Sequence, residues 1–162
     1  MVRFRMEPQE PGSLGDLPFG WRFAIDLARP RATVFHLLGD PLAWPGFYPD
    51  IRSMRWLDAA GVGARREVVT RAGTLQERFV VWEPGHRMAY YVEWMTIPVA
   101  GAFTEDLTLE DTPAGSRLHW VVRYRPRLPF RPLRPVLDPI FRRMFERGTA
   151  LLPDFAAGYP ST

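Results

Sequence analysis

Two glutamates in the middle of the chain, Glu77 and Glu105, are the residues best placed to do chemistry. Each lies in a segment of alternating apolar and polar residues and shares a side with the apolar ones. A carboxylate on an apolar face is rarely buried alone, because removing its water costs several kcal/mol or raises its pKa by as much as ~3 to 5 units. Two such carboxyl groups can differ in pKa and act as acid and base.

Arg66 is the expected partner of Glu77. If residues 72–73 form a two-residue hairpin loop, Arg66 falls on the face of Glu77 and diagonal to it. The hydroxyl of Tyr90 or Tyr124, or a ligand, would serve Glu105. The candidate catalytic residues are therefore Glu77, Glu105 and Arg66, in acid/base chemistry that suits aldol cyclisation or dehydration. An internal salt bridge that only satisfies its own charges is an equally weighted interpretation.

Other kinds of catalytic site find little support. The chain has no cysteine, which excludes a disulfide framework, a Cys-ligated metal and a Cys nucleophile. The three histidines fall on a predicted helix, a turn and an outer strand face, and no serine has a histidine at a suitable spacing. We therefore expect no metal and no cofactor.

The order of the predicted elements positions these residues. A half-buried strand at 19–27 is followed by two short helices between 31 and 44. Strands are then predicted at 51–57, 64–71, 74–82, 87–94, 102–110 and 117–124. One long amphipathic helix near 133–152 closes the chain. Such a lone helix has only the concave face of a curved sheet to bury against, and this arrangement leaves a cavity between them.

The closing helix carries a broad apolar face, which we expect to point at the sheet. Its members are Leu133, Val136, Leu137, Ile140, Phe141, Met144, Phe145, Leu151 and Leu152. Prolines at positions 132, 135 and 139 predict a kinked or late start, and Pro153 predicts the end of the helix.

Two hairpins, taken separately, predict one apolar inner face. With residues 84–85 as a second two-residue loop, Phe79 pairs with Tyr90 and Leu75 with Trp94. A cavity of roughly 300 to 1,000 Å³ lined by both glutamates would favour a ligand site over a filled core. The predicted ligand-binding residues are Trp44, Phe47, Tyr48, Phe79, Tyr90, Trp94, Phe103, Glu105, Trp120, Tyr124, Phe141 and Phe145.

Length and composition fit one domain. The chain has 162 residues, 46% of them hydrophobic, which is enough for a single core. We expect the domain at 18–155, a flexible N-terminal arm at 1–17 and a tail at 156–162. No apolar run approaches the roughly 18 to 20 residues that cross a bilayer, and none resembles a signal peptide. A cytoplasmic protein is expected, as a monomer or a homodimer.

Charge gives a weaker indication of partners. All 21 basic residues are arginine and the net charge is only +3, which points to a compositional bias and argues against nucleic-acid binding. An arginine cluster between 123 and 143 is interpreted as a solvated face. A transient membrane-surface contact or an acidic ligand is the sharper alternative.

Several short motifs match one family pattern. They begin with Asp40-Pro41-Leu42-Ala43-Trp44-Pro45-Gly46-Phe47-Tyr48-Pro49 and continue at 51–57, 61–65, 77–79, 82–90 and 112–120. In these motifs the sequence resembles the START-like helix-grip superfamily (SRPBCC), in its polyketide cyclase/dehydrase and lipid-transport branch. The resemblance implies an α+β fold, with a seven-stranded antiparallel sheet wrapped around a long C-terminal helix. Two small helices would close one end of a hydrophobic tunnel.

Three functions remain open, because members of such a superfamily bind or transform very different apolar ligands on one fold. The leading hypothesis is a binding or carrier protein for a small hydrophobic ligand, such as a lipid, an isoprenoid or an aromatic polyketide. The alternative is a cofactor-free cyclase/dehydratase that uses the carboxyl groups of the same cavity. A ligand-free interaction domain with a filled interior is the third.

Overall fold

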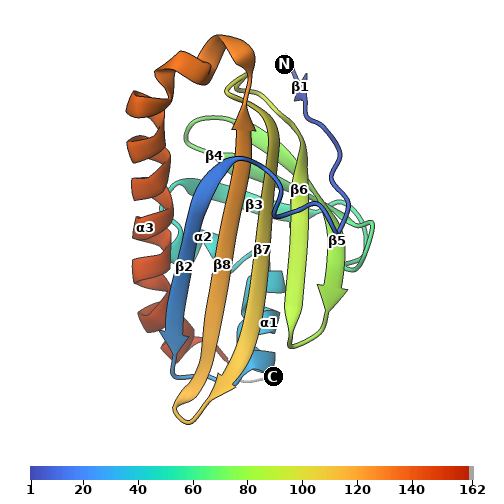
Figure 1. Ribbon diagram of the computed structural model, residues 1–162. Helices are drawn as coiled ribbons and strands as arrows, with labels where there is room; N and C mark the ends of the chain where they lie inside the picture. Colours follow the sequence, from blue (N-terminus) through green and yellow to red (C-terminus); the bar gives the residue numbers. More distant parts are fainter. Residues whose placement is uncertain (161–162) are drawn as a thin grey trace.

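The computed structural model describes residues 1–160, which form a curled antiparallel sheet and a long C-terminal helix (Figure 1). The elements are β1 (Phe4–Arg5), β2 (Phe19–Leu27), α1 (Arg31–Gly39), α2 (Trp44–Phe47), β3 (Ile51–Trp56), β4 (Arg65–Thr70), β5 (Thr74–Glu83), β6 (Arg87–Met95), β7 (Ala100–Thr112), β8 (Gly115–Pro126), the 3₁₀ helix η1 (Leu128–Leu133) and α3 (Arg134–Gly158). The predicted helix-grip architecture is confirmed.

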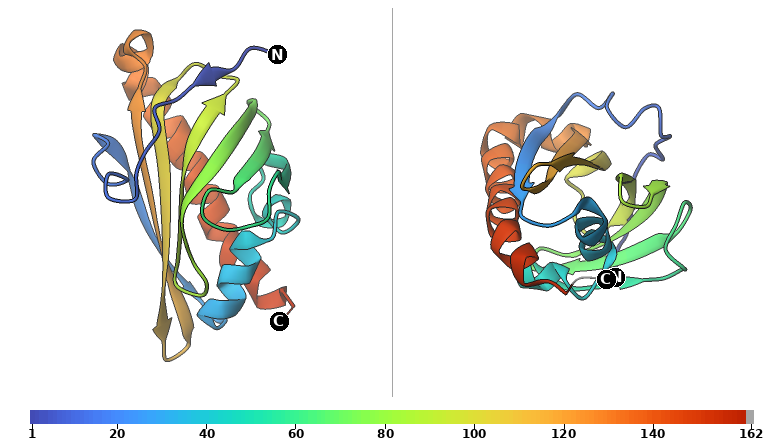
Figure 2. Two further views of the ribbon diagram at one scale, coloured as in Figure 1. Left: turned by 90° about the vertical axis from the view of Figure 1, so that its right-hand side faces the viewer. Right: turned by 90° about the horizontal axis from the view of Figure 1, so that it is seen from below.

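The main sheet follows the order β2-β8-β7-β6-β5-β4-β3, and β1 pairs with β6. Strands that are consecutive along the chain pair as antiparallel neighbours, except that β2 pairs with the last strand, β8. The sheet therefore curls into a half-barrel, and α3 packs chiefly against β2 and α2 (Figure 2). The helix covers the concave side, where most of the apolar core lies.

Two β-bulges change the inner face of β5 and β6. The predicted pair Phe79–Tyr90 is confirmed, but on either side of it the register shifts by one residue. A one-residue shift moves side chains to the opposite face. Leu75 therefore pairs with Met95 instead of Trp94. Trp94 pairs with the next residue of β5, Gln76, and shares the outer face with it. The prediction that Trp94 faces the cavity is wrong for this reason.

The β4–β5 hairpin differs from its prediction by two residues. Val69 pairs with Thr74, so the loop spans residues 70–73 instead of 72–73. An even shift keeps every side chain on its predicted face. Arg66 consequently stands directly opposite Glu77 and not diagonal to it.

The N-terminal segment lies on the sheet where β6 and β7 separate. Pairing between these strands ends at Tyr91 and Thr104, beyond which β1 pairs with β6. The backbone N–H of Glu7 donates to the carbonyl of Gly101 at 2.9 Å, so the segment bridges both strands. Its buried side chains are Met6, Gln9, Leu14 and Leu17. These contacts dock the segment predicted as a flexible arm, and the flexibility itself stays a prediction.

Only part of the apolar face of α3 is buried. The buried residues, Phe145, Gly148, Thr149, Leu152 and Ala156, lie from the middle of the helix onwards. Leu133, Val136, Ile140 and Leu151 are exposed, which corrects their predicted orientation towards the sheet. The apolar face is wider than the stripe that β2 and α2 can cover.

The end of α3 also differs from prediction. The helix continues through Pro153 to Gly158, so it takes up the first part of the predicted tail at 156–162. Residues 161–162 of that tail lie outside the described residues. Among residues 1–160, no helix is both long and apolar enough to span a membrane.

Candidate functional site: an apolar cavity with a buried carboxyl group

A cavity of about 130 Å³ lies between the sheet and α3, with almost entirely apolar walls. It is smaller than the roughly 300 to 1,000 Å³ of drug-sized ligand sites, so a larger ligand requires movement of the wall. In the parts of the wall formed by η1 and by α3 before Phe145, no residue is buried. The predicted residues that line the cavity are Trp44, Tyr48, Glu77, Tyr90, Phe103, Glu105, Trp120, Tyr124, Phe141 and Phe145.

Four predicted site residues do not line the cavity. Phe47, Phe79 and Arg66 are fully buried in the core behind the wall. Trp94 lies on the outer face, with the guanidinium carbon of Arg3 4.1 Å from its ring centroid. These four residues therefore do not contact a ligand in the cavity directly.

Several wall residues were missed by the sequence analysis. Trp21 on β2 lines the cavity, as do Phe130 on η1 and Leu137 on α3. The alternation of β2 already placed Trp21 on the apolar side of its strand, and that signal was sufficient to find it. Phe130 had no such signal, because it lies in a proline-rich 3₁₀ turn.

Glu105 is the polar group at the inner end of the cavity. Its Oε2 atom accepts hydrogen bonds from the Tyr90 hydroxyl at 2.9 Å and from the Trp120 indole N–H at 2.6 Å. Burial raises the pKa of Glu105 to about 8; the nearby Glu77 raises it too, while the two hydrogen bonds lower it. The carboxyl group is therefore mostly protonated at neutral pH.

The proton of Glu105 has one evident location. Both hydrogen bonds are accepted by Oε2, and among residues 1–160 no hydrogen bond is found to Oε1. Oε1 is thus the oxygen left to carry the proton. Because Glu105 lines the cavity, this O–H is a donor for a ligand oxygen.

Glu77 and Arg66 form a buried ion pair. The Arg66 Nε atom lies 2.6 Å from Glu77 Oε2, and the two side chains are 0% and 6% exposed. Burial raises the pKa of Glu77, and the charge and hydrogen bond of Arg66 oppose that rise. Rings of Trp44, Trp56, Phe79 and Tyr90 surround the guanidinium, with centroids 4.9 to 5.4 Å from its carbon.

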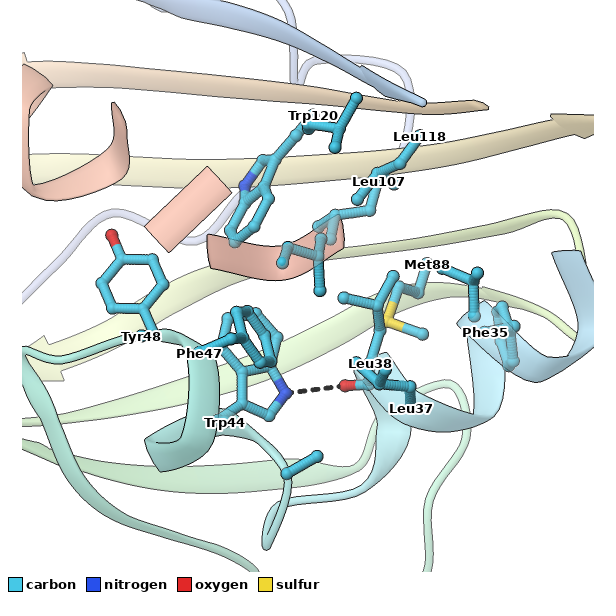
Figure 3. Packing of buried hydrophobic residues seen from close by; sticks show 14 of the residues in the cluster. Phe35, Leu37, Leu38, Trp44, Phe47, Tyr48, Met88, Leu107, Leu118 and Trp120 are labelled. Carbon is cyan, nitrogen blue, oxygen red and sulfur yellow. Dashed lines mark hydrogen bonds between the residues drawn. The ribbon is translucent and has the colours of Figure 1, made fainter. Parts of the chain in front are cut away.

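The same arginine supports the small helices. Its Nη1 atom donates to the carbonyl of Leu38 at 3.2 Å, and that carbonyl also accepts from the Trp44 indole at 2.9 Å (Figure 3). The Trp56 indole donates to the carbonyl of Gly39 at 2.9 Å. The last carbonyls of α1 are thus satisfied by side chains, and a cation stabilises the negative end of the helix.

The aromatic rings of α2 complete the inner wall. Figure 3 shows the rings of Trp44 and Tyr48 beside that of Trp120. The centroids of Trp44 and Trp120 are 5.6 Å apart with nearly perpendicular planes, an edge-to-face arrangement that stabilises aromatic pairs. α3 approaches at Gly148, where a Cβ atom would lie only 2.4 Å from the Tyr48 ring.

No metal-binding cluster of three or more His, Cys, Asp or Glu side chains is found among residues 1–160. The polar groups that line the cavity are Glu105, Glu77 with its partner Arg66, the Arg134–Asp138 pair and the hydroxyls of Thr70, Tyr48, Tyr90 and Tyr124. Of these groups, Glu105 alone combines a raised pKa of about 8 with a free oxygen.

Comparison with known proteins agrees with this geometry. Residues 3–154 match the family described as "Polyketide cyclase / dehydrase and lipid transport". Uncharacterised proteins of Mycobacterium tuberculosis and Mycobacterium bovis are 35% identical over 133 residues, covering 78% of this chain and 80% of theirs.

Solved structures show the same fold at low sequence identity. The Zhui aromatase/cyclase from Streptomyces sp. R1128 superposes with a TM-score of 0.74 at 15% identity, over 86% of this chain and 93% of its own. The protein TTHA0849 from Thermus thermophilus gives 0.73 at 15% identity, over 88% and 100%. The di-domain ARO/CYC StfQ of the steffimycin biosynthetic pathway gives 0.70 at 15% identity, over 90% and 53%.

Proposed function

Because the chain belongs to the polyketide cyclase/dehydrase and lipid-transport family, we propose that it binds a small, mostly apolar molecule in the cavity beside α3. The proposed ligand class is lipid-, isoprenoid- or polyketide-like, with one oxygen that accepts a hydrogen bond from Glu105. The observation that carries the proposal is a buried carboxyl group with a raised pKa of about 8 and an oxygen without a hydrogen bond, in a mostly apolar wall.

The surroundings of Glu105 support binding through one oriented contact. The other two carboxyl groups of the wall already have their charges balanced, Glu77 by Arg66 and Asp138 by Arg134. A neutral donor in an apolar wall favours a neutral ligand, because a charged one would lose its hydration without gaining a counter-charge. One hydrogen bond then fixes the end of the ligand, and apolar contacts supply most of the affinity.

Catalysis by the same site is the second candidate, and the raised pKa of Glu105 favours it. A carboxyl group that is protonated at neutral pH is suited to act as a general acid. In a dehydration, Glu105 would give its proton to a leaving hydroxyl group, released as water, while the Glu77 carboxylate takes a proton from the adjacent carbon. Binding and transport of a ligand require only the hydrogen bond from Glu105 and need no general base.

Native mass spectrometry of the protein purified from its own host tests the proposal. We expect a co-purified apolar molecule that is retained about three- to tenfold less well by Glu105→Leu, which lacks the hydrogen bond. The matched control is Glu110→Leu, an exposed position on the same strand.

Three results would change the conclusion. Equal retention by the two variants would show that Glu105 does not hold the ligand. Absence of a ligand, together with no binding of the apolar dye anilinonaphthalene sulfonate, would favour the ligand-free interaction domain. Turnover of a polyketide-like substrate that is lost in Glu105→Gln while binding is kept would favour the cyclase/dehydratase.

A further inference from the structure

The surface around the start of α3 has an unusual composition. Between residues 128 and 143 every exposed position is aliphatic, proline or arginine: Leu128, Pro129, Arg131, Pro132, Leu133, Pro135, Val136, Pro139, Ile140, Arg142 and Arg143. Leu128, Leu133, Val136 and Ile140 are 81%, 50%, 64% and 59% exposed. We refer to these four side chains with Arg131 and Arg143 as the apolar–arginine surface.

The four aliphatic residues are not core residues that happen to be partly uncovered. Leu133, Val136 and Ile140 follow one another at three- and four-residue spacing, so they share one side of the helix. The cavity is lined by the adjoining strip of the same broad apolar face, which carries Leu137 and Phe141. In the first half of α3 the apolar face is thus wider than the strip that faces the protein, and the rest of it is exposed.

The charges of this region are one-sided. Among residues 1–160, neither Arg131 nor Arg143 has an ion-pair partner. The two acidic groups nearest in sequence are already paired: Asp138, which is only partly exposed, with Arg134 at 2.7 Å, and the exposed Glu146 with Arg142 at 2.7 Å. Arg127, at the start of η1, binds backbone carbonyls and no carboxylate. The surface therefore presents apolar side chains within a positive field.

The N-terminus extends this surface. Figures 1 and 2 show β1 at the same end of the molecule as η1. Met1 and Val2, just before β1, are strongly exposed. Arg3 follows them, and it contacts the ring of Trp94 and no carboxylate. Apolar and basic residues from both ends of the chain therefore lie at one end of the fold.

We propose that the apolar–arginine surface docks on an anionic lipid membrane. Its aliphatic side chains would enter the boundary between headgroups and acyl chains, and Arg131 and Arg143 would contact lipid phosphates. Phe130, which lies between these residues in sequence, lines the cavity, so docking would turn this end of the cavity towards the bilayer. The proposal does not depend on what the cavity holds.

The composition favours lipid over a protein partner. The centres of protein interfaces are enriched in aromatic residues and methionine as well as arginine, and their rims are polar. The exposed positions from 128 to 143 include no aromatic, amide or acidic residue. Aliphatic and arginine side chains complement an anionic bilayer, which needs no matched hydrogen-bond pattern.

Co-sedimentation with vesicles tests the proposal. We expect binding to mixed phosphatidylglycerol–phosphatidylcholine vesicles and much weaker binding to phosphatidylcholine alone. The double variant Val136→Ser/Ile140→Ser should lower the partition coefficient at least about tenfold, because two aliphatic side chains no longer leave water. Arg131→Gln/Arg143→Gln should lower it by more than about tenfold at low salt, and less at high salt.

The control variant is Leu42→Ser/Val62→Ser, which removes two even more exposed aliphatic residues outside this surface and should bind like the wild type. Binding that is unchanged in Val136→Ser/Ile140→Ser would overturn the proposal, as would a loss of the same size in the control. Absence of vesicle binding, with a dimer in solution that the same double variant dissociates, would show that the surface is an interface between copies of this chain.

Discussion

Replacing Glu105 by Gln should change how the stability of the protein depends on pH. In the unfolded chain the carboxyl group titrates near its ordinary pKa of 4.5, whereas burial raises the pKa to about 8 in the folded protein. Between these two values the unfolded chain gives up the proton while the folded protein keeps it. The free energy of unfolding contributed by this group therefore falls as the pH rises from 4.5 to about 8.

The size of the effect follows from the two pKa values. They differ by about 3.5 units, and each unit corresponds to about 1.36 kcal/mol, which gives a loss of about 5 kcal/mol above pH 8. A Gln side chain does not titrate. Its carbonyl oxygen can accept from Tyr90 and Trp120 as Oε2 does, and its amide replaces the carboxyl O–H.

Urea unfolding followed by tryptophan fluorescence measures this difference. Near about pH 5, Glu105→Gln should be within about 1 kcal/mol of the wild type, and near about pH 9 it should be more stable by about 5 kcal/mol. Because groups distant from Glu105 titrate alike in both proteins, the difference reports on Glu105 and the groups coupled to it, chiefly Glu77. The control Glu110→Gln, exposed on the same strand, should follow the wild type throughout. Parallel profiles of Glu105→Gln and the wild type would refute the raised pKa.

Two further substitutions test the packing of the site. Arg66→Met should cost about 3 to 5 kcal/mol of unfolding free energy, because Glu77 stays buried without a counter-charge, and the double variant Arg66→Met/Glu77→Leu should recover most of it. In denaturant unfolding, a single variant as stable as the wild type would contradict this. Gly148→Ala should cost about 1 to 3 kcal/mol despite better helix propensity, because its Cβ meets the Tyr48 ring at 2.4 Å. Gly158→Ala, with nothing within 4 Å, should cost nothing, and equal thermal midpoints for the two variants would argue against a tight contact.

Alternation along the strands was enough to predict which face most side chains occupy. The two-residue error in the β4–β5 loop left Arg66 and Glu77 on one face, because side chains alternate with a period of two. The same arithmetic failed for Trp94, since each bulge in β5–β6 shifts the register by one residue. A bulge is a property of backbone pairing, and neither strand shows a glycine or proline that would have revealed it.

Helical periodicity predicted α3 but not which part of its apolar face is buried. Ile140 and Phe145 both belong to that face, yet Ile140 is exposed and Phe145 is buried. Burial depends on how far the sheet and α2 reach along the helix, which a local pattern does not contain. The partners of Glu105 show what a pattern can and cannot supply. They come from strands on either side of β7: Tyr90 was one of the two predicted hydroxyl partners and is confirmed, whereas the Trp120 indole was not predicted as a donor.

Residues 4–7 occupy backbone groups that would otherwise form an open strand edge. Beyond Tyr91, β6 has no pairing with β7, and β1 takes the free positions up to Met95. An uncovered edge of this kind accepts strands from other chains, which leads to aggregation or exchange of segments between molecules. Proteolysis or a bulky fusion at the N-terminus would therefore threaten solubility even where the core and the cavity stay intact.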